Sequence, residues 1–175
     1  WQVADLPMPG PPSRDHRATW RRINHHRQMC GVLPLDYNEK LTEGMADHIA
    51  YMKRNRLRTH KQNPKSPGYT RKGAIAGGTS LIGFLKASYD QAVNSQLTTL
   101  FHRGAMLSPS LRASAMELID GTFMFSCRRA MGGPLRGKPL VYPAHGMSDV
   151  PCEFNIAGEQ PPPFKGPVIQ NRKGT

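Results

Sequence analysis

The segment from Leu100 to Pro109, LFHRGAMLSP, divides the chain into two halves of different character. Before it, apolar residues recur every three or four positions, which is the period of amphipathic helices. After it, short alternating runs are separated by Gly and Pro, a pattern typical of short strands and turns. A chain with helices first and strands later predicts an α+β domain, in which helices pack on a small antiparallel sheet.

The first half predicts three helices, each preceded by a residue that can accept a hydrogen bond from the first turn. Ser13, Asp36 and Asp90 are these expected N-caps. The helices are expected over residues 13–30, 37–55 and 90–103. Residues 60–80 lie between the second and third helices and are rich in Pro, Gly and Ser, so we expect a long loop there. Long loops inside compact domains are usually functional.

The second half predicts short strands. Runs of apolar and β-branched residues at 115–119 and 122–129 flank Asp120-Gly121, a dipeptide that favours a hairpin turn. A further strand is expected over residues 138–142. The remaining chain is interrupted by prolines and is expected to be extended.

Three parts of unequal size follow from this pattern: an N-terminal arm at 1–12, a domain at 13–164 and a C-terminal tail at 165–175. Both ends are rich in Pro and Gly, and such ends are ordered only when something holds them. We therefore expect the arms to contact other protein chains of an assembly. The first residue is Trp1, which suggests processing or trimming at the start of the chain.

The chain is strongly basic, with 24 Lys and Arg against 12 Asp and Glu and a net charge of +12. This balance favours an anionic partner: an acidic protein, an anionic lipid or a nucleic acid. The basic residues are spread along the chain, so a solvated basic surface is an equal alternative. No apolar run reaches the roughly 18 residues of a membrane span.

Cysteine usage leaves the redox state open. The chain holds Cys30, Cys127 and Cys152, an odd number without a Cys-x-x-Cys spacing, so a structural zinc site is not expected. One alternative is a Cys127–Cys152 bridge in an oxidising compartment. The other is three reduced, buried thiols.

Five short motifs occur in a defined order along the chain. An Asn-x-x-Arg segment leads into a Gly-to-Leu link, an Ala-x-His-x-x-Tyr segment follows, and a His then precedes a Pro-Gly-Tyr-Thr loop. His-Arg comes next, before a leucine and a proline, and a Tyr-Pro segment opens the tail. The motifs read INHHRQMCGVLPL, ADHIAYM, His60 with PGYTRKGAIA, HRGAMLSP, and YPAHGMSDVPCEFNIAGEQPPP. Over residues 20–164 the chain thus resembles the bacterial-type branch of the CAP superfamily, which contains cysteine-rich secretory, antigen 5 and pathogenesis-related proteins.

The resemblance implies an α-β-α sandwich with two histidines facing each other across a cleft, and His60 and His102 match those positions. Many CAP proteins add two acidic residues that help to bind a divalent metal. This chain departs from that pattern, because Gly77 to Ser80 stand where many members have Gly-Glu-Asn, and Lys61 follows the first histidine. Two imidazoles alone supply too few ligands for zinc, so no cofactor is expected. If a metal does bind, His60 and His102 are its expected ligands.

The sequence therefore predicts a non-enzymatic CAP-like domain that acts as an accessory subunit of a larger assembly. No G-x-S-x-G, H-E-x-x-H or phosphate-loop motif is present, and no catalytic residue is assigned. One alternative is a secreted protein that binds a sterol, lipid or metal between His60 and His102; another is a hydrolase using the same cleft. The resemblance implies an extracellular or cell-surface protein, and a mitochondrial assembly is the alternative location.

Overall fold

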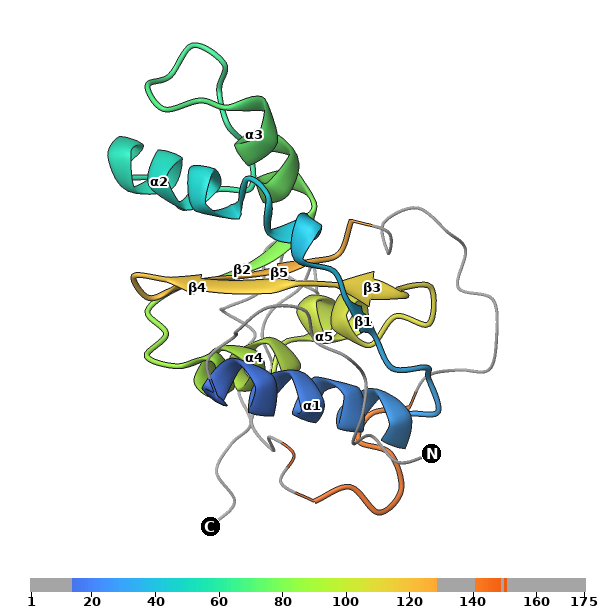
Figure 1. Ribbon diagram of the computed structural model, residues 1–175. Helices are drawn as coiled ribbons and strands as arrows, with labels where there is room; N and C mark the ends of the chain where they lie inside the picture. Colours follow the sequence, from blue (N-terminus) through green and yellow to red (C-terminus); the bar gives the residue numbers. More distant parts are fainter. Residues whose placement is uncertain (1–13, 129–140, 149, 151–175) are drawn as a thin grey trace, which may run out of the picture.

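The computed structural model describes residues 14–128, 141–148 and 150 (Figure 1). Within these residues the fold is α+β. The elements in chain order are α1 (Arg14–Met29), β1 (Asp36–Tyr37), the 3₁₀ helix η2 (Glu39–Thr42), α2 (Met45–Asn55), α3 (Arg71–Gly78), β2 (Ser80–Gly83), α4 (Tyr89–Leu97), α5 (Leu100–Met106), β3 (Ala113–Ser114), β4 (Met116–Ile119) and β5 (Thr122–Ser126).

The sheet is small and antiparallel, with the strand order β2-β5-β4. β4 and β5 form the expected hairpin, and both Asp120 and Gly121 have positive φ values of 47° and 75°. Such a turn favours Gly and tolerates Asp, which is why the dipeptide identified it correctly. A separate two-residue parallel pair joins β1 to β3.

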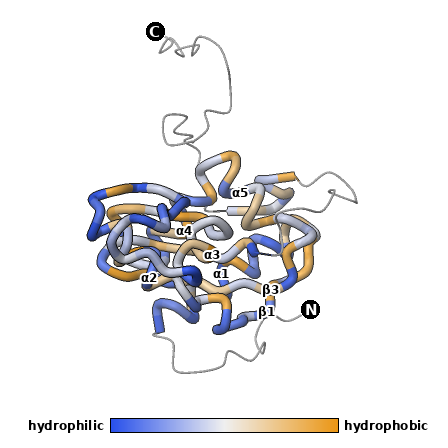
Figure 2. The backbone as a smooth tube through the Cα atoms, turned by 90° about the horizontal axis from the view of Figure 1, so that it is seen from above, coloured by the Kyte–Doolittle hydropathy of each residue, from blue (hydrophilic) through white to orange (hydrophobic). Residues whose placement is uncertain are grey.

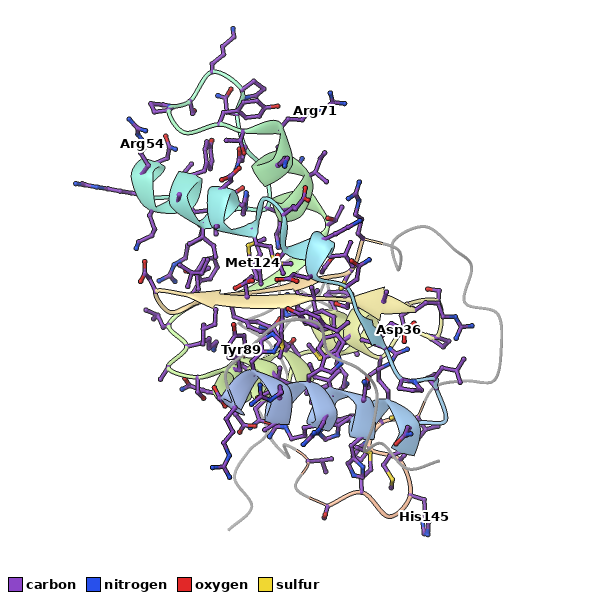
Figure 3. The ribbon with its side chains drawn as sticks, in the orientation of Figure 1. Asp36, Arg54, Arg71, Tyr89, Met124 and His145 are labelled. Carbon is purple, nitrogen blue, oxygen red and sulfur yellow. The ribbon has the colours of Figure 1, made fainter. Side chains whose placement is uncertain are left out.

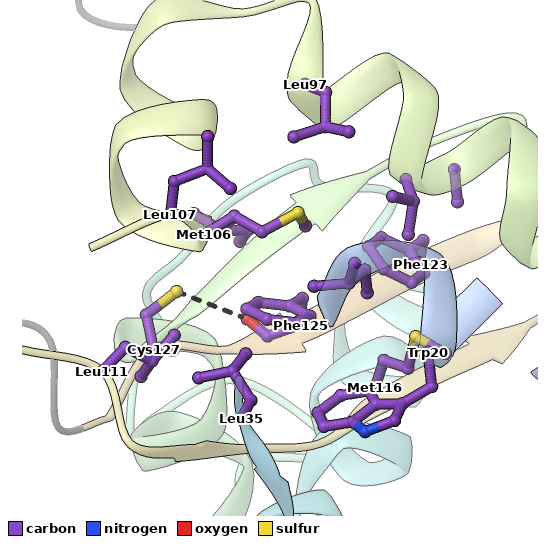
Figure 4. Packing of buried hydrophobic residues seen from close by; sticks show 14 residues of the cluster. Trp20, Leu35, Leu97, Met106, Leu107, Leu111, Met116, Phe123, Phe125 and Cys127 are labelled. Atoms are coloured by element: carbon purple, nitrogen blue, oxygen red, sulfur yellow. Dashed lines mark hydrogen bonds between the residues drawn. The ribbon is translucent and has the colours of Figure 1, made fainter. Parts of the chain in front are cut away.

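Helices cover both faces of the sheet, with α2 and α3 on one side and α1, α4 and α5 on the other (Figure 1). Alternation along the strands divides the core, because neighbouring strand residues point to opposite faces. Leu81 and Phe125 belong to the cluster with α1, α4 and α5, whereas Ile82 and Met124 belong to the cluster with α2 and α3. Figure 4 shows the larger cluster, in which Phe125 and Cys127 lie close to Met106 and Leu107.

The Asn-x-x-Arg motif of α1 joins this helix to distant backbone. Asn24 exchanges two hydrogen bonds with the backbone of Leu35, at 2.8 and 3.1 Å. Arg27 is fully buried and donates to the carbonyl oxygens of four residues. These are Leu33, Met106, Ser108 and Leu111, at 2.8 to 3.2 Å. The motif therefore supports the fold.

Three predictions for the first half of the chain, two helices and one loop, need correction. The helix expected over 37–55 begins only at Met45, because 36–37 pair with β3 and 39–42 form a 3₁₀ turn. The helix expected over 90–103 is two helices, since Thr99 has an extended backbone (φ −103°, ψ 145°) and ends the first. The long loop expected over 60–80 contains α3 and the first residue of β2. The structure thus has five α-helices in its described part, where the sequence predicted about three.

Several predictions lie wholly or largely outside the described residues: the N-terminal arm, the cap at Ser13, most of the strand at 138–142, the C-terminal tail and Cys152. Cys30 and Cys127 are free thiols. Cys127 is buried, which raises the pKa of its thiol to about 12, so the thiol stays protonated within the apolar core at neutral pH. Among the described helices, none is long and apolar enough to cross a membrane.

Candidate functional site

His60 lies in the chain between α2 and α3 and fastens that segment to α3. Its Nδ1 is 2.9 Å from the carbonyl oxygen of Gly77, so the ring donates Nδ1–H to the last turn of the helix. The residue is exposed to solvent. The first of the two predicted cleft histidines is therefore at the surface, with one ring nitrogen committed to the backbone.

His102 lies on α5, and its Nδ1 is 2.8 Å from the hydroxyl oxygen of Thr99. That hydroxyl donates its own proton to the carbonyl of Gln96 at 3.0 Å, so it accepts from the ring. α3 and α5 belong to helix layers on opposite faces of the sheet (Figure 1). Each imidazole is thus bonded within its own layer, and a shared cleft between His60 and His102 stays a prediction.

His48, on the buried side of α2, uses both of its ring nitrogens in hydrogen bonds. Its Nε2 is 2.8 Å from the carbonyl oxygen of Thr59, and its Nδ1 is 3.1 Å from the side-chain nitrogen of Gln62. The carbonyl can only accept, so Nε2 carries the proton and Nδ1 accepts from Gln62. Both nitrogens of this ring hold the chain that follows α2.

The same polar network continues to α3. The Gln62 carbonyl oxygen accepts from the Thr70 amide at 3.0 Å, and the Thr70 hydroxyl donates to Asp47 at 2.9 Å while accepting from the Gly73 amide. The Tyr51 hydroxyl accepts from the Asn63 amide at 2.9 Å. We call this set the α2–α3 network: Asp47, His48, Tyr51, Thr59, Gln62, Asn63, Thr70 and Gly73. It fixes the loop at both ends and in the middle.

Two glycines allow α3 to lie directly on this network. A Cβ at Gly77 would overlap the His48 ring, and a Cβ at Gly73 would come within 2.5 Å of the Gln62 side-chain nitrogen. The two positions are four apart, so they share one face of α3. Close approach of the helix, and hence the geometry of the network, depends on the missing side chains.

Burial sets the charge of His48. The residue is fully buried, and desolvation lowers the pKa of its imidazole below the usual 6.5. Hydrogen bonding to Thr59 opposes this effect, and the nearby His60 adds to it. The ring is therefore neutral at neutral pH, as its acceptor role toward Gln62 requires.

The arrangement does not gather metal ligands in the part of the chain that the structure describes, since no group of three or more His, Cys, Asp or Glu there is placed to hold an ion. Asp47, on α2, accepts a hydrogen bond from Thr70 and is the one carboxylate of the network. These polar groups hold the loop between α2 and α3, because each of them forms a hydrogen bond with backbone or with another member of the network.

Sequence reasoning identified His48 as part of the Ala-x-His-x-x-Tyr motif, and the structure shows that the residue is buried. It missed Gln62 and Thr70, because an amide and a hydroxyl inside a Pro- and Gly-rich stretch give no periodic signal. The spacing of Gly73 and Gly77 was the available clue. Two glycines four apart within RKGAIAGG predict a helix face in close contact with another element.

The chain is similar to known proteins in both sequence and fold. A sequence model described as "CAP: Cysteine-rich secretory protein family" matches residues 20–119. The chain is similar in structure to an extracellular protein containing a SCP domain from Bacillus anthracis str. Ames, with a TM-score of 0.52 and 16% sequence identity, covering 66% of this chain and 43% of that one. This chain thus matches less than half of that structure's length, and the likeness concerns the fold alone. No curated protein matches the chain.

Proposed function

The chain belongs to the CAP family of cysteine-rich secretory proteins, and we propose that it uses the family scaffold as a non-enzymatic interaction module, an accessory subunit of a larger assembly. The proposal includes an extracellular place of action, because the structural neighbour from Bacillus anthracis is described as an extracellular protein. In this role the protein binds other protein chains.

The observation that carries the proposal is the α2–α3 network. A catalytic acid, base or nucleophile must be free to exchange hydrogen bonds with a substrate during the reaction. Here His48 uses both ring nitrogens, and Asp47 accepts from Thr70, to hold the loop between α2 and α3. Groups that many enzymes use for chemistry are engaged in positioning a surface segment.

The electrostatic character of the chain supports the same function. A net charge of +12 attracts anionic surfaces and speeds association with them. In the stretch where many CAP proteins contribute an acid, this chain has Gly77, Gly78 and Thr79. The chain therefore retains the scaffold with a strong positive charge and without the acidic part of the family's cleft.

The test uses the full chain with a small affinity tag, isolated from its own cells without denaturant. We expect a particle well above the monomer mass of 19.5 kDa by native mass spectrometry. His60→Ala and His102→Ala variants that fold normally should be recovered in the same particle. Folding is checked by circular dichroism and thermal unfolding.

Two results would overturn the proposal. One is a chain that is isolated only as a monomer. The other is an ester or peptide hydrolysis activity of the pure protein that disappears in His102→Ala while the fold is intact, since this would identify the hydrolase alternative.

A further inference from the structure

The chain between the last turn of α2 and the first turn of α3 is basic without interruption by acids. We call residues 53–72 the basic segment. It contains eight Lys or Arg residues and neither Asp nor Glu: Lys53, Arg54, Arg56, Arg58, Lys61, Lys65, Arg71 and Lys72. One third of the 24 basic residues of the protein thus lie in one short stretch.

All eight basic side chains are exposed. Two have acidic partners: Lys53 is 2.6 Å from Asp120, and Lys72 is 3.2 Å from Glu43. The other six form no ion pair with any described residue. Figure 3 shows Arg54 and Arg71 projecting from the α2–α3 layer away from the sheet, and Figure 2 shows the hydrophilic character of the chain around the end of α2. Positive charge on this surface is largely uncompensated.

The segment is held in one conformation although it is mostly loop. The Asn55 side chain donates to the carbonyl oxygens of Tyr51 and Pro67, both at 2.9 Å, which ties the end of α2 to the far side of the loop. The α2–α3 network fixes Asn63 and Thr70 between these points. A charged surface that is ordered before binding loses little conformational entropy when a partner docks.

Apolar side chains are exposed among these charges. Leu57 is 48% exposed between Arg56 and Arg58, and Tyr69 is 37% exposed. Ile75, on the outer side of α3, is 40% exposed. Arginine and tyrosine are enriched in the central parts of protein–protein interfaces, where apolar contacts accompany charge complementarity.

We propose that the basic segment is the docking surface for an acidic segment of a partner protein, in which apolar residues alternate with Asp or Glu. The proposal deepens the proposed function, on which it rests, by naming the surface and the partner chemistry. Carboxylates pair with Arg54, Arg56 and the lysines of the loop, while an apolar side chain between them contacts Leu57.

The composition of the segment favours a protein over other polyanions. Proteins that bind single-stranded nucleic acid stack bases on aromatic side chains. Membrane-surface helices present a continuous apolar face opposite their basic face, whereas the basic segment is mostly loop and exposes Leu57 singly. Tyr69 is the one Phe, Tyr or Trp residue in the basic segment, and a single ring offers little surface for stacking successive bases. A phosphate backbone would also leave Leu57 and Ile75 without a contact.

The experiment measures fluorescence anisotropy of a labelled peptide with the full chain. The peptide repeats Glu-Leu-Asp over about 12 residues, long enough to span roughly 40 Å when extended. Arg54→Gln/Arg56→Gln is expected to weaken its binding about tenfold. The matched control Arg14→Gln/Arg21→Gln removes the same charge from exposed positions of α1, and it should weaken binding no more than about twofold.

The apolar part of the proposal has its own control. A second peptide with Ser in place of Leu should bind about threefold more weakly, and Leu57→Ser should remove most of the difference between the two peptides. Equal binding of both peptides would contradict the proposed contact with Leu57.

Two further results would overturn the proposal. The first is an equal loss in both double variants, which would mean that total charge, and not this surface, binds the peptide. The second is tighter binding to single-stranded RNA or to vesicles of phosphatidylserine in phosphatidylcholine, lost in Arg54→Gln/Arg56→Gln, which would assign the surface to those partners. If the native assembly still forms in Arg54→Gln/Arg56→Gln, the proposed docking surface is wrong but the accessory-subunit function is not contradicted. If the native protein is a monomer, the accessory-subunit function itself is wrong.

Discussion

The two faces of the sheet are covered in different ways. Under α1, α4 and α5 lies an extensive apolar cluster built around Trp20, Phe123 and Phe125 (Figure 4). Under α2 and α3 lies a smaller apolar cluster, with the polar α2–α3 network beside it. One face therefore supplies most of the apolar burial that stabilises the fold, and the other uses specific hydrogen bonds to fix the shape of an exposed loop.

The apolar face contains a buried charged side chain, which tests this distinction. Arg27 is buried there and satisfies four backbone carbonyls between α1 and the chain around α5. Burial lowers the pKa of its guanidinium to about 10, so the side chain remains charged at neutral pH. A single side chain thus satisfies backbone groups that helix and sheet hydrogen bonds leave unpaired.

The largest effect is expected for Arg27→Met. Methionine fills similar volume but removes the hydrogen bonds to four carbonyl oxygens, and each lost bond costs about 1 kcal/mol; the Ser108 carbonyl keeps a donor in the Leu111 amide at 3.1 Å. We expect the free energy of unfolding to fall by about 4 kcal/mol, measured by urea denaturation. A loss below about 1 kcal/mol would show that these bonds do not stabilise the apolar side.

On the opposite face, Gly77→Ala should have the next largest effect. The added methyl group overlaps the His48 ring, so α3 or the imidazole must shift, and the variant should lose about 3 kcal/mol in the same measurement. Gly78→Ala is the matched control, because a Cβ there meets no atom within 4 Å. Its effect should stay within about 1 kcal/mol in either direction. Equal losses in the two variants would argue against close packing of α3 on His48.

A smaller, pH-dependent effect distinguishes His48 from its surroundings. Its pKa in the folded protein lies below 6.5, so the unfolded chain binds the proton more readily, and folding stability falls as the pH drops below about 6.5. At pH 8, His48→Gln should cost about 1 kcal/mol, because the bond from Gln62 is lost.

Between pH 8 and pH 5, the stability of His48→Gln should fall less than that of the unchanged protein, measured by denaturation at each pH. His16 and His26 also have pKa values lowered by burial, so part of the pH dependence will remain. A wild-type pH profile in the variant would show that His48 does not contribute to it.

Sequence patterns predicted the elements whose signals are local. The first helix, expected over residues 13–30, spans Arg14–Met29 and is followed by Gly31 with a positive φ of 73°, and the β4–β5 hairpin turns at Asp120-Gly121 as expected. α3 was missed because RKGAIAGG has weak helix propensity, and its packing against α2 through Gly73 and Gly77 outweighs that weakness. Thr99 similarly divided a predicted helix, since its extended backbone was not visible in the apolar pattern.

The candidate site was predictable only in part. His60 was singled out by its place among the motifs, but its bond to Gly77 depends on α3, which the pattern did not predict. Gln62 and Asn63 act through neighbours eight and twelve residues away, at a spacing that no helical or strand period produces. Side chains that bridge loops carry no periodic signal, so their partners emerge only from the three-dimensional arrangement.

The most direct test of the account is hydrogen exchange of two backbone amides in the loop. Asn63 donates to the Tyr51 hydroxyl and Thr70 to the Gln62 side chain, so both amides should be protected in the unchanged protein. Gly77→Ala should abolish this protection while the amides of β5 keep theirs. Exchange of Asn63 and Thr70 at the rate of an unstructured peptide in the unchanged protein would contradict the claim that this face of the sheet holds the basic segment in a fixed shape.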